Sequence, residues 1–104
     1  MAAKLITVYW RDIPAQVIAK KGRASTKAML SARFQEAIDR AAMRAGRGGS
    51  DAYLAEWRRE SRACGEDLQA EVDAAAAELE RGYSDADLQA LAKARGVREG
   101  GHEE

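Results

Sequence analysis

The chain has 104 residues, of which 46% are hydrophobic and 33% are charged, values typical of one globular domain with a single core. No apolar run approaches the roughly 18 residues that a membrane span needs, and the residues after Met1 lack the layout of a signal peptide. A single cysteine, Cys64, excludes an internal disulfide. We therefore expect a cytoplasmic protein without a membrane partner.

Charge is unevenly distributed along a chain whose formal net charge is zero. Residues 1–50 hold ten Lys or Arg and three Asp or Glu, whereas residues 51–104 hold seven and fourteen. Two interpretations remain open. The halves neutralise each other inside the fold, or a basic face stays available for an anionic ligand.

The segment Lys4–Lys21, KLITVYWRDIPAQVIAKK, carries the strongest β-strand signal. Leu5–Trp10 is rich in β-branched and aromatic residues, and period 2 places Ile6, Val8 and Trp10 on the more apolar face, which we expect to meet the core. The break at Arg11–Pro14 predicts a hairpin or a bent ribbon, with a second strand that resumes at Gln16.

Helical spacing of apolar residues dominates the remainder of the chain. We predict four helices, approximately Ser25–Ala45, Asp51–Arg59, Glu66–Arg81 and Asp85–Arg95. Ser84 and Asp87 have the spacing of a capping box at the start of the last one, and Ser25 or Thr26 is the expected cap of the first. We expect the stretch from Ser61 to Gly65 to be irregular or briefly extended.

These elements predict an α+β fold: an N-terminal two-stranded β-ribbon packed on three to four α-helices, in a single domain over residues 1–97. Residues 98–104 are expected to form a disordered tail. A two-stranded ribbon is marginal in water, so its unfilled edges are expected to pair with a partner.

The sequence contains no recognisable constellation for catalysis or for metal binding. Its single histidine is His102, and no spaced Cys or His motif occurs. Cys64 precedes a predicted helix, but no histidine lies within the folded region to act as its base, so we interpret it as structural. We expect no metal site, no cofactor and no enzymatic activity.

Two sets of side chains are candidates for binding. Aromatic residues beside arginines have the composition of interface hot spots, and on this basis the expected partner-binding residues are Tyr9, Trp10, Arg11, Asp12, Trp57, Arg58 and Arg59. For Trp10, core packing remains the default interpretation. An anion-binding alternative uses the basic half of the chain, through Lys20, Lys21, Arg23, Lys27 and Arg47.

Three segments resemble a small bacterial domain family described as virulence factor: Val8–Val17, Phe34–Met43 and Asp51–Arg59. The resemblance covers about residues 3–83, and WRDIPAQV is its most specific string. The family is defined by a phenotype, so the resemblance implies no catalytic residue. For stand-alone forms it suggests a link to folate-dependent methyl metabolism.

The first functional hypothesis is therefore a non-enzymatic accessory protein that binds another protein, or a second copy of itself, through the N-terminal ribbon. The second is an anion-binding or nucleic-acid-binding module, with nucleic acid the less expected ligand because the whole chain is neutral. The third, which rests on the resemblance, is an accessory subunit of a one-carbon enzyme.

Overall fold

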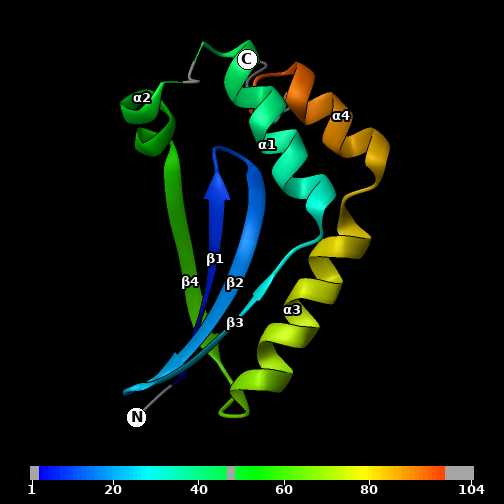
Figure 1. The fold of residues 1–104 in the computed structure, drawn as a ribbon. Coiled ribbons are helices and arrows are strands. Elements are labelled where there is room, and N and C mark those ends of the chain that lie inside the picture. Colours follow the sequence, from blue (N-terminus) through cyan, green and yellow to red (C-terminus); the bar gives the residue numbers. More distant parts are fainter. Residues whose placement is uncertain (1–2, 47–48, 98–104) are drawn as a thin grey trace, which may run out of the picture.

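A computed structural model describes residues 3–46 and 49–97 of the chain. A four-stranded antiparallel sheet carries α1, α3 and α4 on one side, while α2 lies at the end where β4 begins (Figure 1). The elements in chain order are β1 (Ala3–Trp10), β2 (Ile13–Lys21), β3 (Ala24–Met29), α1 (Ala32–Arg44), α2 (Ser50–Ala55), β4 (Trp57–Cys64), α3 (Leu68–Gly82) and α4 (Asp85–Lys93). The α+β class is confirmed.

The predicted ribbon is the centre of the sheet. The strand order is β3-β2-β1-β4, so both edges of the β1–β2 hairpin are filled by strands of the same chain. The expectation of unfilled ribbon edges is therefore wrong. The hairpin turn is shorter than predicted and consists of Arg11 and Asp12, because Trp10 already pairs with Ile13.

Proline is accommodated inside β2 rather than before it. Pro14 lies opposite Tyr9, beside a register shift between Val8 and Tyr9, and an irregular position of this kind tolerates a residue without an N–H group. A bulge also increases local twist and re-aims side chains. Trp10 and Ile13 accordingly both belong to the cluster that packs on α1.

Part of the first predicted helix is a strand. Residues 24–29 form β3 and pair with β2, for example Lys27 with Ile18, so the helix starts at Ala32 with Ser31 as its N-cap residue. Neither Ser25 nor Thr26 caps it. Four of the six residues of β3, Ala24, Lys27, Ala28 and Met29, have high helical propensity. The strand follows a tight turn at Gly22, whose φ is 60°, and cross-strand pairing overrides that propensity.

The second predicted helix is also shorter than expected. It ends at Ala55, and Trp57–Cys64 forms β4, which pairs with β1 along its whole length. Ser61–Cys64, part of the stretch that was expected to be irregular or briefly extended, forms the end of this strand. The last helix was predicted closely: the Ser84 hydroxyl accepts from the Asp87 amide and the Asp87 carboxylate accepts from the Ser84 amide, which completes the capping box.

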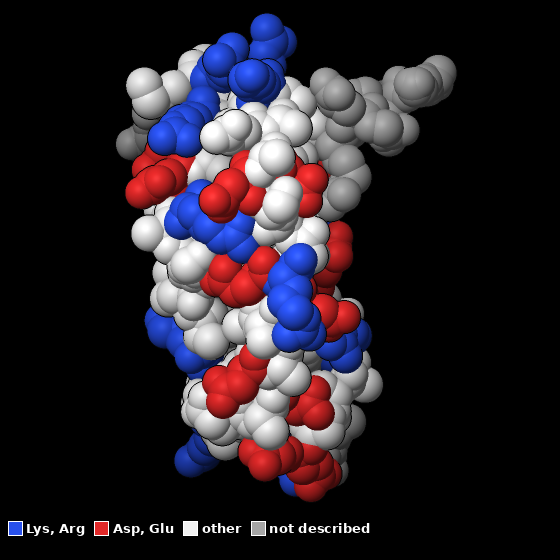
Figure 2. Space-filling model, turned by 90° about the vertical axis from the view of Figure 1, so that its right-hand side faces the viewer, with Lys and Arg blue, Asp and Glu red and all other residues white. Residues whose placement is uncertain are grey.

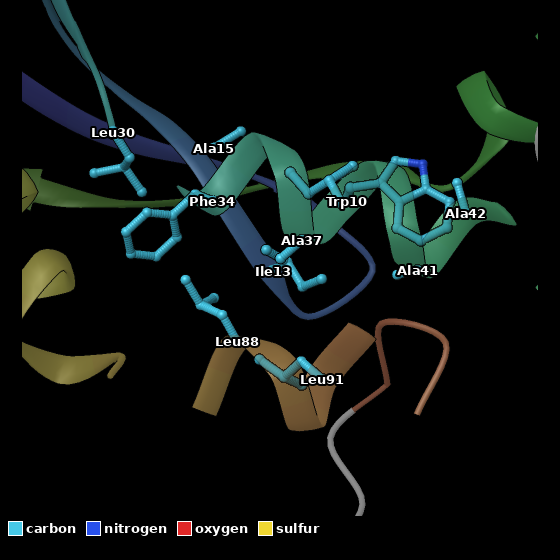
Figure 3. Packing of buried hydrophobic residues seen from close by; sticks show 11 residues of the cluster. Trp10, Ile13, Ala15, Leu30, Phe34, Ala37, Ala41, Ala42, Leu88 and Leu91 are labelled. Carbon is cyan, nitrogen blue, oxygen red and sulfur yellow. The ribbon is translucent and has the colours of Figure 1, made fainter. Parts of the chain in front are cut away.

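The core has two parts, both on the helical side of the sheet. One joins the β1–β2 bend to α1 and α4, and Figure 3 shows Trp10 beside Ala41 and Ala42, with Leu88 and Leu91 projecting from α4. The other joins the centre of the sheet to α3 through Leu5, Val17 and Val72.

Ile6 and Val8 differ from the sequence prediction in the face that they occupy. They are 7% and 8% exposed, yet they belong to neither helical cluster. Because Leu5 packs on α3, strand alternation places Ile6 and Val8 on the opposite side of the sheet. Of the three residues expected to meet the helical core, Trp10 alone does so.

Candidate functional site

Arg58 is the centre of a group of side chains at the β1–β2 bend. Its guanidinium lies 4.5 Å from the centroid of the Tyr9 ring, its Nη2 is 3.1 Å from the Asp12 carboxylate, and its Nε donates to the carbonyl oxygen of Arg11 at 2.8 Å. It also forms an ion pair with Glu60. Burial lowers the pKa of Arg58, but the hydrogen bonds and charges of Glu60 and Asp12 outweigh it and raise the pKa overall. Arg58 therefore ties β4 to the bend.

Arg11 fastens the same bend to two other segments. Its Nε lies 3.3 Å from a Glu56 carboxylate oxygen, and its Nη1 donates to the carbonyl oxygen of Arg95 at 2.9 Å. The backbone φ of Arg11 is 54°, a left-handed conformation that costs a non-glycine residue roughly 1 kcal/mol. Contacts from both sides hold the residue in this conformation.

Trp10 lies in the protein interior. It is fully buried, its Nε1 donates to the carbonyl oxygen of Tyr53 at 2.9 Å, and the two rings stack at 5.8 Å. Trp57 meets the Tyr53 ring edge-on, with a centroid distance of 5.7 Å. Of the predicted partner-binding residues, Trp10 is thus a core residue, and Tyr9, Arg11, Asp12 and Arg58 form an internal network.

Arg59 has a different environment from its neighbour Arg58, because consecutive residues of a strand point to opposite faces. It lies opposite Val8, on the side of the sheet that carries no helix. We name this side the open face. Strand alternation and register place twelve residues on it: Lys4, Ile6, Val8, Gln16, Ile18, Lys20, Ser25, Lys27, Met29, Arg59, Ser61 and Ala63. The same alternation leads on to the Trp10–Trp57 pair at the bend, but both of these residues pack with the helical cluster and are not part of the open face.

Cations of the open face converge on a hollow of about 400 Å³. Lys20 and Lys27 line it from β2 and β3, and Arg59 reaches it from the far edge of the sheet. Ile18 contributes an apolar wall. All three cationic residues are exposed, and none forms an ion pair within the described part of the chain.

Lys4 adds a fourth cation to the open face and lies directly opposite Lys20 in the β1–β2 ladder. Like charges at opposite positions of neighbouring strands destabilise a sheet by a fraction of 1 kcal/mol. Glu60 is the one acidic residue among the four strands, and its pairing with Thr7 places it on the helical side. The open face therefore has positive charge without a carboxylate to neutralise it.

The helical side carries both signs of charge. Figure 2 shows acidic and basic side chains interspersed over it. Ion pairs there join the two halves of the chain, for instance Lys21 with Glu66 at 2.7 Å and Arg33 with Glu80 at 3.2 Å. Charges of the two halves thus neutralise each other on the helical side, whereas the use of the basic open face by an anionic ligand stays a prediction.

The predicted anion-binding residues are divided by this arrangement. Lys20 and Lys27 lie on the open face, Lys21 pairs with Glu66 on the helical side, and Arg23 is exposed in the β2–β3 turn. Arg47 lies outside the described residues. Lys4 was not among the predicted anion-binding residues, and Arg59 was expected to bind a protein partner together with Arg58. Register alone reveals that these two share a face with Lys20.

No group of His, Cys, Asp and Glu that could hold a metal ion occurs within residues 3–46 and 49–97. Cys64, at the end of β4, is half-buried. Burial raises the pKa of its thiol and the Glu71 carboxylate raises it further, while Arg62 opposes both. A raised pKa reduces the thiolate fraction near neutral pH, which agrees with a structural role. None of the described helices has the length and apolar content to cross a bilayer.

The fold and this surface define an α+β domain whose sheet is covered by helices on one side and presents a cationic open face on the other. The chain belongs to the family described as Virulence factor, whose model matches residues 8–92. That match confirms the resemblance seen in the sequence. Neither the curated proteins nor the solved structures contain a match to the chain.

Proposed function

We propose that this protein is a non-enzymatic accessory domain that binds an acidic surface of another protein through the open face. The observation that supports the proposal is the concentration of Lys4, Lys20, Lys27 and Arg59 on a sheet face that has no carboxylate. The opposed lysines repel each other in the free protein, and an anionic partner would convert that repulsion into attraction.

A protein partner suits this face better than a nucleic acid. Sheets that bind single-stranded nucleic acid use aromatic side chains on which bases stack, and none of the twelve residues of the open face is aromatic. Ile18 lies among the cations, and Met29 is 64% exposed at the edge. Apolar groups between charges match a protein surface that combines carboxylates with apolar side chains.

The family description connects the chain with virulence and specifies no mechanism. An accessory role is compatible with it, since a binding domain contributes to a phenotype through its partner. We place the protein in the cytoplasm, where a single unpaired cysteine is stable.

The test uses two anionic probes, poly-L-glutamate and an oligo-dT strand, with binding followed by fluorescence anisotropy at several salt concentrations. The double variant Lys20→Glu/Lys27→Glu, called the face variant, reverses two positive charges of the open face. The control is Arg40→Glu/Arg81→Glu, because it makes the same change in net charge at exposed helical positions. We expect poly-L-glutamate to bind the wild type and the control and to release as salt rises. The face variant should lose binding.

Two results would count against the proposal. Equal binding of poly-L-glutamate by the face variant and the control would show that net charge, and not the open face, governs the interaction. Tighter, face-dependent binding of oligo-dT than of poly-L-glutamate would assign the face to nucleic acid.

A further inference from the structure

The outer edge of β4 is a second candidate for binding. β4 has eight residues, pairs with β1 throughout without a register shift, and has no neighbouring strand on its other side in the described sheet. It contains no proline, and its six central residues are exposed. An edge of this kind presents unpaired N–H and C=O groups to any strand that can lie beside it.

Symmetry restricts how two copies of β4 could pair with each other. Antiparallel strands in one sheet are related by a twofold axis perpendicular to the sheet, and this axis places one residue opposite its own copy. If the axis passes through residue 59, 60, 61 or 62, the part of β4 that pairs with its copy is residues 57–61, 57–63, 58–64 or 60–64, respectively. Because opposed residues share a face, each register has a definite set of charge contacts.

Charge selects one register out of the four. A centre at Arg59 or Arg62 sets an arginine against its own copy, and a centre at Glu60 opposes two glutamates. A centre at Ser61 places Glu60 opposite Arg62 of the second copy, twice by symmetry, and opposes no like charges. Arg62 forms no ion pair within the described chain, so its guanidinium is available for this contact. Glu60 already pairs with Arg58 through Oε2, and its Oε1 is the oxygen that would meet Arg62 of the second copy.

The other edge of the sheet lacks these properties. β3 has six residues and one charged side chain, Lys27. A symmetric pairing of β3 either opposes Lys27 to its own copy or leaves it opposite a neutral residue. No register of β3 gains an ion pair, so the β3 edge has no electrostatic preference for itself.

We propose that the protein forms a symmetric dimer in which the two β4 strands pair antiparallel about Ser61, with reciprocal Glu60–Arg62 ion pairs. The two sheets then form one eight-stranded sheet. Because the twofold axis is perpendicular to the sheet, both open faces lie on the same side and form one continuous cationic surface. The dimer depends on the strand edge and stands independently of what the open face binds.

Sedimentation velocity tests the dimer over loading concentrations from about 10 to about 500 µM, which bracket the weak affinity expected of a small interface. We expect the wild type to shift from monomer to dimer. Glu60→Arg and Arg62→Glu should each remain monomeric, since each opposes like charges in the Ser61 register. The swapped variant Glu60→Arg/Arg62→Glu restores opposite charges and should dimerise again.

Disulfide trapping tests the register directly. In a Cys64→Ser background, Ser61→Cys lies opposite its own copy at the spacing of an antiparallel pair, close enough for a disulfide. Arg59→Cys, on the same face two residues away, would lie opposite Ala63 and serves as the control. We expect the Ser61→Cys variant to form covalent dimers many times faster under mild oxidation.

Three outcomes would overturn the inference. They are a wild type that stays monomeric at every loading, a swapped variant that is folded by circular dichroism but monomeric while the wild type dimerises, and equal cross-linking at the two cysteine positions. Poly-L-glutamate binding is also measured with the monomeric Arg62→Glu variant. This measurement distinguishes a failure of the dimer from a failure of the proposed function.

Discussion

Glu80 makes the connection between α3 and the start of α1, and its replacement by glutamine gives a quantitative test of the fold. Its carboxylate accepts hydrogen bonds from the Ser31 backbone N–H at 2.6 Å, from the Ser31 hydroxyl at 2.9 Å and from Arg33 at 3.2 Å. Ser31 is the N-cap residue of α1, and its side chain makes no capping hydrogen bond of its own. The carboxylate therefore supplies negative charge at a helix N-terminus, where the helix dipole favours it.

The cost of Glu80→Gln follows from these contacts. Glutamine keeps one carbonyl acceptor but loses the charge, and a hydrogen bond to a charged group contributes about 1 kcal/mol more than one between neutral groups. The Glu80 side chain is 33% exposed, so solvent screening reduces the gain from its ion pair. We expect a loss of about 1–2 kcal/mol in the free energy of unfolding, which lowers the Tm by about 5–15 °C for a domain of this size.

The pH dependence has a definite sign. Burial raises the pKa of Glu80, but the hydrogen bonds from Ser31 and the charge of Arg33 lower it more, so the folded-state pKa lies below the unfolded value. The stabilisation is therefore complete above the unfolded pKa and is lost as pH falls through the folded pKa. The difference between wild type and Glu80→Gln should be full at pH 7 and shrink below about pH 4.5.

Urea unfolding followed by circular dichroism from pH 7 to pH 3 measures this difference. Glu78→Gln is the matched control, since Glu78 is exposed on the same helix, and it should change stability little at any pH. A difference between wild type and Glu80→Gln that stays constant down to pH 3, or an equal loss in the Glu78→Gln control, would refute the assignment of this role to the carboxylate.

Two further predictions concern the bend and the open face. Gly96 has a φ of 84°, and a Cβ there would lie 3.0 Å from the Trp10 ring, so Gly96→Ala should cost about 2–4 kcal/mol in urea unfolding. Gly82→Ala, which meets nothing within 4 Å, is its control, and equal effects would contradict the close packing. Lys20→Gln removes the repulsion from Lys4 and should raise stability by a few tenths of a kcal/mol at low salt, with the gain vanishing near about 0.5 M salt. A loss of stability at low salt would show that the two lysines do not repel each other.

Local signals in the sequence predicted the elements whose formation is decided locally. The β1 segment is strongly β-branched, and the capping box fixed the start of α4. β3 was missed because ASTKAM consists largely of helix-compatible residues, and pairing with β2 decides its conformation. β4 was missed because both of its faces are exposed, which removes the alternation that identifies a strand.

The residues of the open face could not be predicted for a similar reason, because strand register decides which face each side chain occupies. Arg58 and Arg59 are adjacent and looked equivalent in the sequence, but a strand sends them to opposite faces. Arg58 contacts Tyr9 and Asp12 within the chain, while Arg59 lines the hollow together with Lys20 and Lys27. The basic first half of the chain made a cationic surface one of two open interpretations, and Arg59 joins that surface from the acidic second half. Which residues belong to this surface depends on strand register, and the local sequence pattern does not determine that register.

The most direct test of the central claim is photo-crosslinking in the native cell from two positions. A photoreactive amino acid replaces Met29, which is 64% exposed on the open face, or Arg81, which is exposed on α3. We predict a cross-link from position 29 to one protein with an acidic surface, its loss in the Lys20→Glu/Lys27→Glu background, and none to that protein from position 81. Cross-linking to the same protein from position 81 alone, or unchanged cross-linking in the charge-reversed background, would contradict the claim that the open face is the binding surface.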